Sequence, residues 1–219
     1  MYAFGIFDSV DRSLFLARDP FGIKPLYFAD DGKSFRFASQ VKALLKGGAI
    51  DSSPSPAGHV GFYLWGHLPD PHTLFNGIRA LESGSTMLVG ARGARGPRKY
   101  FKIADEFATA NALVASLSPQ ASRESLHAAL RDSVRHHLIA DVPVGVFLSS
   151  GLDSATLTAL AAEASESEIR TISLGFDEYR GTRDDETPLA CLVARTYGTA
   201  HRTQWVSRQD FAACVEDIC

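Results

Sequence analysis

Residues 142–154 read VPVGVFLSSGLDS, a continuous apolar run followed at once by a short loop of Ser, Gly, Leu and Asp. The run from Val142 to Leu148 is typical of a strand that is buried on both faces of a sheet. The stretch 154–164 is rich in Ala and Leu, which predicts a helix. The loop therefore lies between the carboxyl end of a strand and the start of a helix, where open α/β sheets bind ligands.

Helices and strands alternate on both sides of this unit. The preceding helix has an apolar face at helical spacing, formed by Leu126, Ala129, Leu130, Val134 and Leu138. The flanking elements are, in order, that helix, capped by Ser122, a strand over 170–176, a helix over 187–198, a strand over 201–206 and a helix capped by Ser207. This order predicts a parallel sheet with helices on its faces.

The first 106 residues follow a different pattern. Short β-type runs over 2–8, 13–19, 26–30 and 34–39 are separated by turn signals and predict an antiparallel meander, with Gly32 in a hairpin turn. A short helix over 40–46 follows, while 57–66 has a period that is ambiguous between strand and helix. We therefore expect an α+β domain over 1–106, a linker over 107–120 and an α/β domain over 121–219.

Composition narrows the classes of function. The 22 Lys and Arg and 25 Asp and Glu give a formal charge of −3 without long runs of one sign, which argues against a nucleic-acid partner. The Met1 to Phe15 segment does not fit a signal peptide, and no apolar stretch approaches bilayer length. Cys191, Cys214 and Cys219 have no zinc or disulfide spacing, so we expect a cytoplasmic protein without membrane contact.

The loop 149–154 carries the parts of a phosphate cradle. Gly151 permits close approach of the backbone, the helix start offers unpaired N–H groups, and Ser149, Ser150 and Ser154 add hydroxyl groups. A carboxylate here would repel a phosphate, so Asp153 is best explained as a Mg²⁺ ligand. The alternative is that Asp153 and Ser154 only cap the helix. The loop is not a Walker A motif, because it has no Lys.

SSGLDS resembles the SGGLDS signature of the N-type ATP pyrophosphatases, with Ser150 in place of the usual Gly. The wider stretch DVPVGVFLSSGLDSA, 141–155, resembles the asparagine synthetase branch. ARDPFGIKPLYF, 17–28, and LPDPHTLFNGIRALESG, 68–84, resemble class II glutamine amidotransferase and synthetase segments. The resemblance implies the later part of an N-terminal-nucleophile glutaminase sandwich, then the first part of a parallel-sheet ATP pyrophosphatase domain of the adenine nucleotide α hydrolase type. It also favours a helix over 61–66.

The resemblance further implies an ATP-dependent amide-forming ligase that makes asparagine from aspartate and glutamine-derived ammonia through β-aspartyl-AMP. ATP and Mg²⁺ are the expected ligands, with Asp153 on the metal. The pyrophosphate-binding positions carried over are Ser149, Ser150, Gly151, Leu152, Asp153 and Ser154, and the adenine-pocket positions are Phe147, Leu174 and Gly175. A homodimer is left open.

No catalytic residue is assigned, because the family's glutaminase nucleophile is an N-terminal Cys, whereas Tyr2 follows Met1 and the first Cys is Cys191. The family's SGEGSDE segment is also missing, so we expect a chain truncated at both ends, without glutaminase activity and with little or no synthetase activity alone. Three alternatives stay open: a related ligase of the β-lactam synthetase or peptide-cyclising type, a non-catalytic remnant, and a nucleic-acid-modifying ATP pyrophosphatase, which the acidic balance opposes.

Five further residues have structural interpretations. Arg18 and Asp19 are expected to form an interior pair that shapes a turn. Glu186 is expected to be an acid near a helix start, where the helix dipole favours it. The adjacent His136 and His137 point about 100° apart on a helix, which disfavours a shared metal ion.

Overall fold

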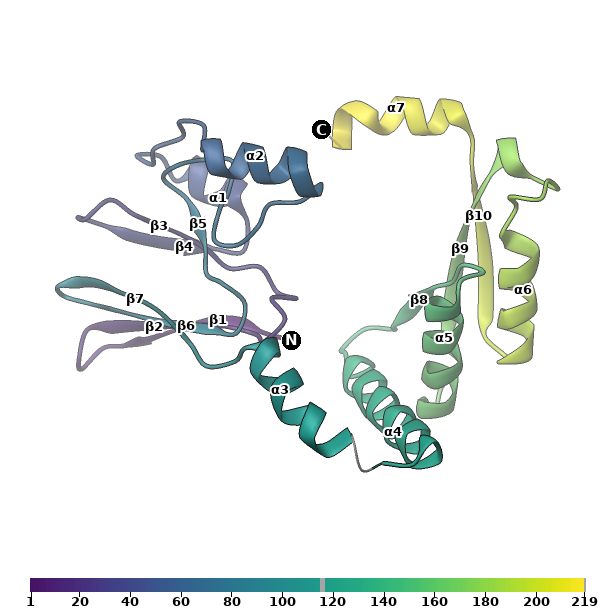
Figure 1. The fold of residues 1–219 in the computed structure, drawn as a ribbon. Helices are drawn as coiled ribbons and strands as arrows, with labels where there is room; N and C mark the ends of the chain where they lie inside the picture. The colour runs from purple at the N-terminus through teal and green to yellow at the C-terminus, as the bar shows by residue number, and fades with distance from the viewer. Residues whose placement is uncertain (115–116, 219) are drawn as a thin grey trace. The chain divides into compact units, whose positions relative to one another are not determined.

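The computed structural model describes residues 1–114 and 117–218, and the chain divides after residue 115 into two compact units. Residues 115 and 116 of the predicted linker lie outside the described residues. The first unit contains β1 (Ala3–Asp8), β2 (Ser13–Arg18), β3 (Tyr27–Asp30), β4 (Phe35–Ala38), α1 (Val41–Lys46), α2 (Pro56–Trp65), β5 (Arg79–Ala80), β6 (Ser85–Gly90), β7 (Gly93–Lys99) and α3 (Ile103–Val114) (Figure 1).

The first unit has two antiparallel sheets with strand orders β1-β2-β6-β7 and β4-β3-β5. The expectation of one continuous meander was wrong, because β2 and β3 lie in different sheets and the chain crosses between them at 19–26. The β3–β4 hairpin is confirmed, with Gly32 at a φ of +78°. Its connection has four residues, and Asp31 accepts hydrogen bonds from the N–H groups of Lys33 and Ser34.

The two sheets pack face to face around an apolar cluster. Leu16 and Met87 from one sheet lie in this cluster with Phe28 and Phe35 from the other. The sheets approach so closely that a Cβ at Gly5 would lie 2.9 Å from the Phe37 ring. Figure 1 shows α1 and α2 beyond the β4-β3-β5 sheet, and the ambiguous stretch 57–66 is resolved as helix α2, followed by Gly66 at a φ of +70°.

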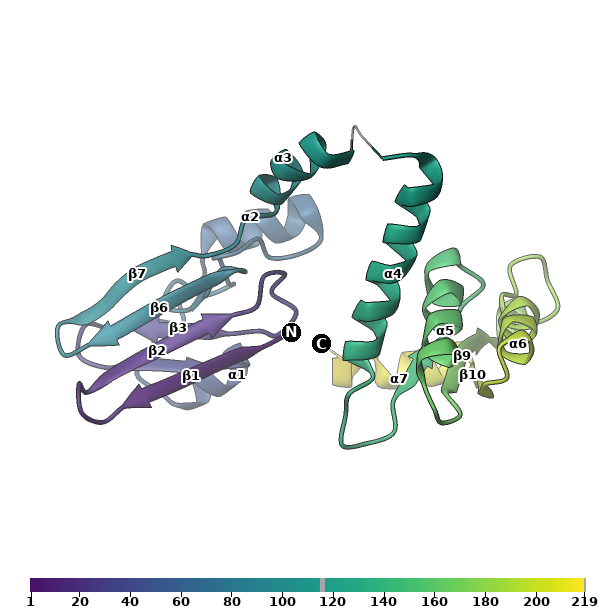
Figure 2. The same ribbon diagram turned by 90° about the horizontal axis from the view of Figure 1, so that it is seen from below.

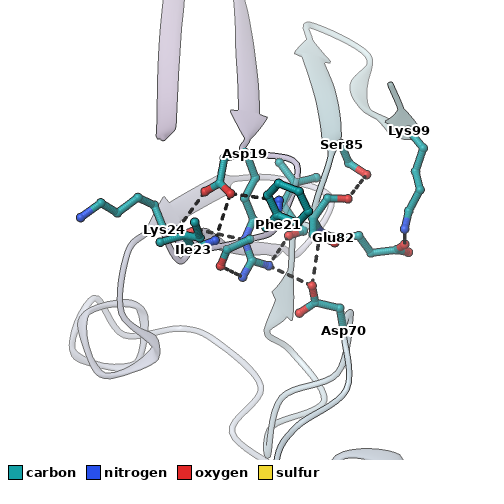
Figure 3. Close-up of polar contacts among 12 residues, drawn as sticks. Asp19, Phe21, Ile23, Lys24, Asp70, Glu82, Ser85 and Lys99 are labelled. Carbon is teal, nitrogen blue, oxygen red and sulfur yellow. Dashed lines mark hydrogen bonds and ion pairs between the residues drawn. The ribbon is translucent and has the colours of Figure 1, made fainter. Parts of the chain in front are cut away.

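The turn that joins the two sheets is fixed by Arg18 and Asp19, but the expected pair between them was wrong. Asp19 accepts hydrogen bonds from the backbone N–H groups of Tyr2, Phe21, Ile23 and Lys24, as Figure 3 shows in part. Arg18 instead pairs with Asp70 at 3.1 Å and donates to three backbone carbonyls. The physical reason is that several backbone N–H groups point at Asp19 and use its acceptor oxygens, whereas Arg18 has only donors and takes carbonyl groups and Asp70 instead.

The second unit contains α4 (Pro119–His137), β8 (Gly145–Phe147), α5 (Leu152–Ala164), β9 (Arg170–Phe176), the 3₁₀ turn η1 (Asp177–Tyr179), α6 (Thr187–Thr196), β10 (Ala200–Val206) and α7 (Arg208–Ile218). Its sheet is parallel with the order β10-β9-β8, which confirms the predicted alternation. Figure 2 shows α4 beside α5, where Arg131 and Glu163 form an ion pair at 3.3 Å.

Three expectations for this unit need correction. The strand predicted over 142–148 is not buried on both faces: β8 spans three residues at the sheet edge and Phe147 is 75% exposed, whereas Val146 is half-buried and Leu148 is buried. The second expectation was that helices lie on the faces of the sheet. Since the strands follow in sequence order, right-handed crossovers place α5 and α6 on the same face, where these two helices contact each other. Helix α4 is capped by Ser118 and not by Ser122, because Pro119 fits the first helical position.

Two further findings concern the helices: where α3 and α4 lie relative to the expected linker, and whether any helix could cross a membrane. The segment 107–120 begins inside helix α3 and ends inside helix α4. Over the residues that the structure describes, no helix is long and apolar enough to cross a bilayer.

Candidate functional site

The loop 149–154 lies between β8 and the start of helix α5. Gly151 is the N-cap of that helix, with φ −72° and ψ 153°, and its capping position carries no side-chain hydrogen bond. The first intrahelical bond is donated by Ala155 N to Gly151 O over 3.1 Å. The N–H groups of residues 152–154 precede that bond and have no carbonyl partner within the helix. These amides, at the positive end of the helix dipole, can donate to an anion.

Two serine hydroxyl groups close the loop on itself. Ser149 Oγ and Ser154 Oγ lie 2.9 Å apart, and Ser154 Oγ also accepts from Ser149 N over 3.1 Å. Ser149 Oγ accepts from Gly151 N over 3.2 Å. The next helical turn fixes Ser154 further, because the fully buried Thr158 donates to its carbonyl over 2.8 Å. The loop therefore has a defined shape that its own side chains hold.

Asp153 lies in the first turn of α5 and is exposed. The alternative interpretation of Asp153 as a helix cap is not supported, because Gly151 is the capping residue and receives no side-chain bond. Among the described residues, the Asp153 carboxylate has neither a hydrogen-bond partner nor an ion-pair partner, and no cluster of three metal-ligand side chains occurs. A single carboxylate fits Mg²⁺, which keeps waters and shares its remaining sites with substrate phosphates.

Ser150 occupies the position where the resembling signature has Gly. Over the described part of the chain, the non-glycine residues with positive φ are Arg12 and Ala49. Ser150 is not among them, so the loop has no left-handed backbone there that would require Gly. The substitution is compatible with this loop conformation.

Phe147 and Leu174, two of the predicted adenine-pocket residues, line one cavity of about 310 Å³ together with Ser149. The cavity lies at the carboxyl end of β8 and beside the middle of β9, and the start of α6 borders it. The residues that sequence reasoning did not assign to it are Leu148, Ile172, Ser173, Glu186, Thr187 and Ala190. Ile172 and Ser173 are the two residues before the predicted Leu174, so a wider window around that position would have included them.

Gly175 lines a neighbouring cavity of about 280 Å³, which also includes Leu174. The third adenine-pocket prediction therefore lies next to the first two rather than in the same cavity. A Cβ at Gly175 would lie 2.7 Å from the Trp205 ring and 2.9 Å from Thr187 Cγ2. Gly at this position allows Trp205 of β10 and the start of α6 to pack on the sheet, which is a structural role beside the predicted one.

Asp185 organises the start of α6, and sequence reasoning did not identify it. Its carboxylate accepts from Thr187 N at 3.0 Å, from Thr187 Oγ1 at 2.7 Å and from Gly181 N at 2.8 Å. The bonds from Gly181 and Thr187 hold the pKa of Asp185 below its ordinary value. Glu186, which we expected at a helix start, is the N-cap of α6 without a side-chain cap bond, and it lines both cavities.

Comparison with known families gives matches to both units. A model described as "Glutamine amidotransferase domain" matches residues 1–101, and a model described as "Asparagine synthase" matches residues 125–219. The chain thus combines an amidotransferase segment with an asparagine synthase segment.

Comparison with curated proteins agrees. A putative glutamine-hydrolysing asparagine synthetase of Mycobacterium tuberculosis is 35% identical over 222 residues, covering 100% of this chain and 33% of the relative. Asparagine synthetase 1 of Bacillus subtilis is 33% identical over 211 residues, covering 96% and 32%. The chain therefore belongs to the glutamine-hydrolysing asparagine synthetase family, and it spans about a third of the length of these relatives.

Proposed function

We propose that the loop 149–154 binds the phosphates of Mg-ATP in a protein that forms asparagine from aspartate, ATP and glutamine-derived ammonia. The observation that carries this proposal is the start of α5, at the carboxyl end of a parallel strand. There the first-turn amides have no carbonyl partner within the helix, and the Asp153 carboxylate has no partner among the residues that the structure describes. The cavity lined by Phe147 and Leu174 begins at Ser149 and suits the adenine ring, because its walls are largely apolar.

Each group of the site has a role in this proposal. The amides of residues 152–154 donate to oxygens of the β- and γ-phosphates, and the Asp153 carboxylate holds Mg²⁺ against them. When bound there, Mg²⁺ would supply positive charge that offsets the charge developing on the pyrophosphate, and Asp153 would hold the ion. Phe147, Leu174 and Gly175 position the adenine, and the loop then orients the α-phosphate toward the second substrate.

The chemistry that follows is adenylation and then amide formation. A carboxylate oxygen of aspartate attacks the α-phosphorus, the bond from that phosphorus to the bridging oxygen breaks, and pyrophosphate leaves with the electron pair. Ammonia then attacks the acyl carbon of β-aspartyl-AMP, and AMP leaves as asparagine forms. A carboxylate needs this activation because its oxygen is a poor leaving group until AMP carries it away.

We further assign the first unit to the later part of an N-terminal-nucleophile glutaminase sandwich, and the second unit to the first part of an ATP pyrophosphatase domain. The two face-to-face antiparallel sheets of residues 1–99 support the first assignment. The strand-loop-helix unit within a parallel sheet supports the second. Glutamine and aspartate are then the small-molecule substrates of the whole protein, besides ATP.

Equilibrium binding by calorimetry tests the loop assignment on the 219-residue chain. We expect Mg-ATP and Mg-pyrophosphate to bind, and Asp153→Ala to weaken both at least about tenfold, since contacts to charged groups contribute about 1.5–3 kcal/mol. Asp141→Ala is the matched control, because Asp141 is also an exposed acid but precedes β8 at the opposite end of that strand. Equal affinity of wild type and Asp153→Ala would refute the assignment.

A further inference from the structure

The pairing of β8 with β9 ends in an unusual way just before the loop. The strand register runs to Phe147 opposite Ile172, and Leu148 N then donates to Ile172 O over 2.8 Å. In a continued parallel ladder, Leu148 O would next accept from the N–H of Leu174. Instead, the hydroxyl group of Ser173 donates to Leu148 O. A side chain from β9 thus takes over the last bond of the ladder.

This bond acts on the first peptide of the loop. The carbonyl of Leu148 and the N–H of Ser149 belong to one planar peptide unit, so fixing both ends fixes its orientation. Ser173 binds the oxygen end, and Ser154 Oγ accepts from the nitrogen end over 3.1 Å. Two hydroxyl groups, one from the neighbouring strand and one from helix α5, therefore hold the peptide at which the chain leaves the sheet.

We infer that Ser173 is a positioning residue for the pyrophosphate-binding loop, an inference that rests on the function proposed for residues 149–154. Ser173 is only 3% exposed and Leu148 is 2% exposed, so the bond is largely shielded from bulk water. Without the hydroxyl group, Leu148 O either stays unpaired or turns toward the N–H of Leu174. In either case the peptide loses the bond that fixes its oxygen end, so it is free to rotate and to carry Ser149 away from Ser154, which opens the loop before the ligand binds.

Substitutions on strand β9 can separate an effect on the position of the loop from a general loss of stability of the second unit. Ser173→Ala removes the hydroxyl group, and Ser173→Thr restores it. Thr171→Val is the matched control, because Thr171 is 3% exposed on the same strand and two residues away. Its hydroxyl group contacts Thr199 Oγ1 and His201 Nδ1, both at 2.9 Å, and not the loop.

Two measurements on the 219-residue chain test the inference. The first is hydrogen exchange of the Ser149 amide in the ligand-free protein, followed by NMR. We expect Ser173→Ala to accelerate this exchange about tenfold, as the loss of one buried hydrogen bond would produce, with little change in Thr171→Val. The second is the affinity for Mg-pyrophosphate, which should fall in Ser173→Ala and recover in Ser173→Thr.

The outcomes distinguish this inference from the proposed function. If wild type does not bind Mg-pyrophosphate, the proposed function fails, while exchange of the free chain still decides whether Ser173 orders the loop. If Ser173→Ala leaves the Ser149 exchange unchanged, the inference is overturned. It is also overturned if exchange accelerates but affinity is unchanged, or if Thr171→Val has the same effects as Ser173→Ala.

Discussion

Replacing Asp19 with Asn should destabilise the first unit strongly, because one carboxylate serves four backbone donors there. Asp19 is 1% exposed. Oδ1 accepts from Phe21 N at 3.1 Å and Ile23 N at 3.0 Å, and Oδ2 accepts from Lys24 N at 2.9 Å and Tyr2 N at 3.3 Å. Asn keeps a single oxygen and can satisfy one of these two pairs. Its amide nitrogen would then face the other two N–H groups, donor against donor.

The expected loss in the free energy of unfolding follows from the two hydrogen bonds that Asn cannot accept. Hydrogen bonds to charged groups contribute about 1.5–3 kcal/mol each, so we expect the free energy of unfolding of this unit to fall by about 3–6 kcal/mol. Native domains have about 5–15 kcal/mol in total, so the variant should be near the limit of folding.

The loss of stability caused by Asp19→Asn should also depend on pH. Burial opposes the ionisation of Asp19, but the four backbone N–H bonds outweigh burial and hold its pKa below the ordinary 3.8. In acid, the unfolded chain therefore takes up a proton at this residue before the folded chain does. The stability that Asp19 contributes is fully present above the ordinary value and is lost as pH falls through the lower folded value. The difference between wild type and Asp19→Asn should consequently narrow in acid.

Urea unfolding read by hydrogen-exchange mass spectrometry follows the first unit separately, through peptides that cover β2 and β6. The matched control is Asp8→Asn, because Asp8 also accepts two turn N–H groups, from Val10 at 2.8 Å and Asp11 at 3.1 Å, but is exposed. An Asp19→Asn variant that loses no more stability at pH 7 than Asp8→Asn would refute the reasoning.

Three predictions concern the second unit. Gly175→Ala should lower the free energy of unfolding by about 1–3 kcal/mol, because its Cβ would lie 2.7 Å from the Trp205 ring. Urea unfolding followed by Trp205 fluorescence measures this loss. Gly145→Ala is the control and should lose less, since its Cβ would lie 3.5 Å from the nearest neighbour. Burial lowers the pKa of His201, so the unit should lose stability as pH falls through the ordinary value of 6.5, and His201→Gln should flatten this dependence in unfolding titrations. Ser150→Gly should not tighten Mg-ATP binding in calorimetry, because Ser150 does not have the positive φ that favours Gly.

Local signals predicted much of the second unit correctly. The strand over 170–176 is β9, and the helix opened by Thr187 is followed by Gly198 at a φ of +62°. Ser207 caps α7 as expected, accepting from Asp210 N over 3.1 Å. These features depend on residues within a few positions of one another, such as a proline at a helix start or a hydroxyl group at a cap, and such signals are present in the sequence itself.

The failures have a different origin. Continuous apolar residues over 142–148 are compatible with a central strand, but the position of a strand within a sheet depends on which neighbours pair with it, and β8 pairs with β9 alone among the described strands. The break between β2 and β3 likewise depends on Asp19, which satisfies the turn that leads from one sheet to the other. Hydrophobic periodicity does not record partners that are distant in the sequence.

Contacts that only the folded chain shows also matter within SSGLDS itself. Its letters suggest three serine hydroxyl groups for the phosphates, yet those of Ser149 and Ser154 already bond to each other, and Ser149 Oγ also accepts from Gly151 N. A phosphate that used either hydroxyl group would first have to break this arrangement. The backbone amides of residues 152–154 carry no such cost, because the helix leaves them without carbonyl partners. In the proposed function, the anion would therefore be held mainly by the backbone of α5, while Ser149 and Ser154 keep the loop in shape.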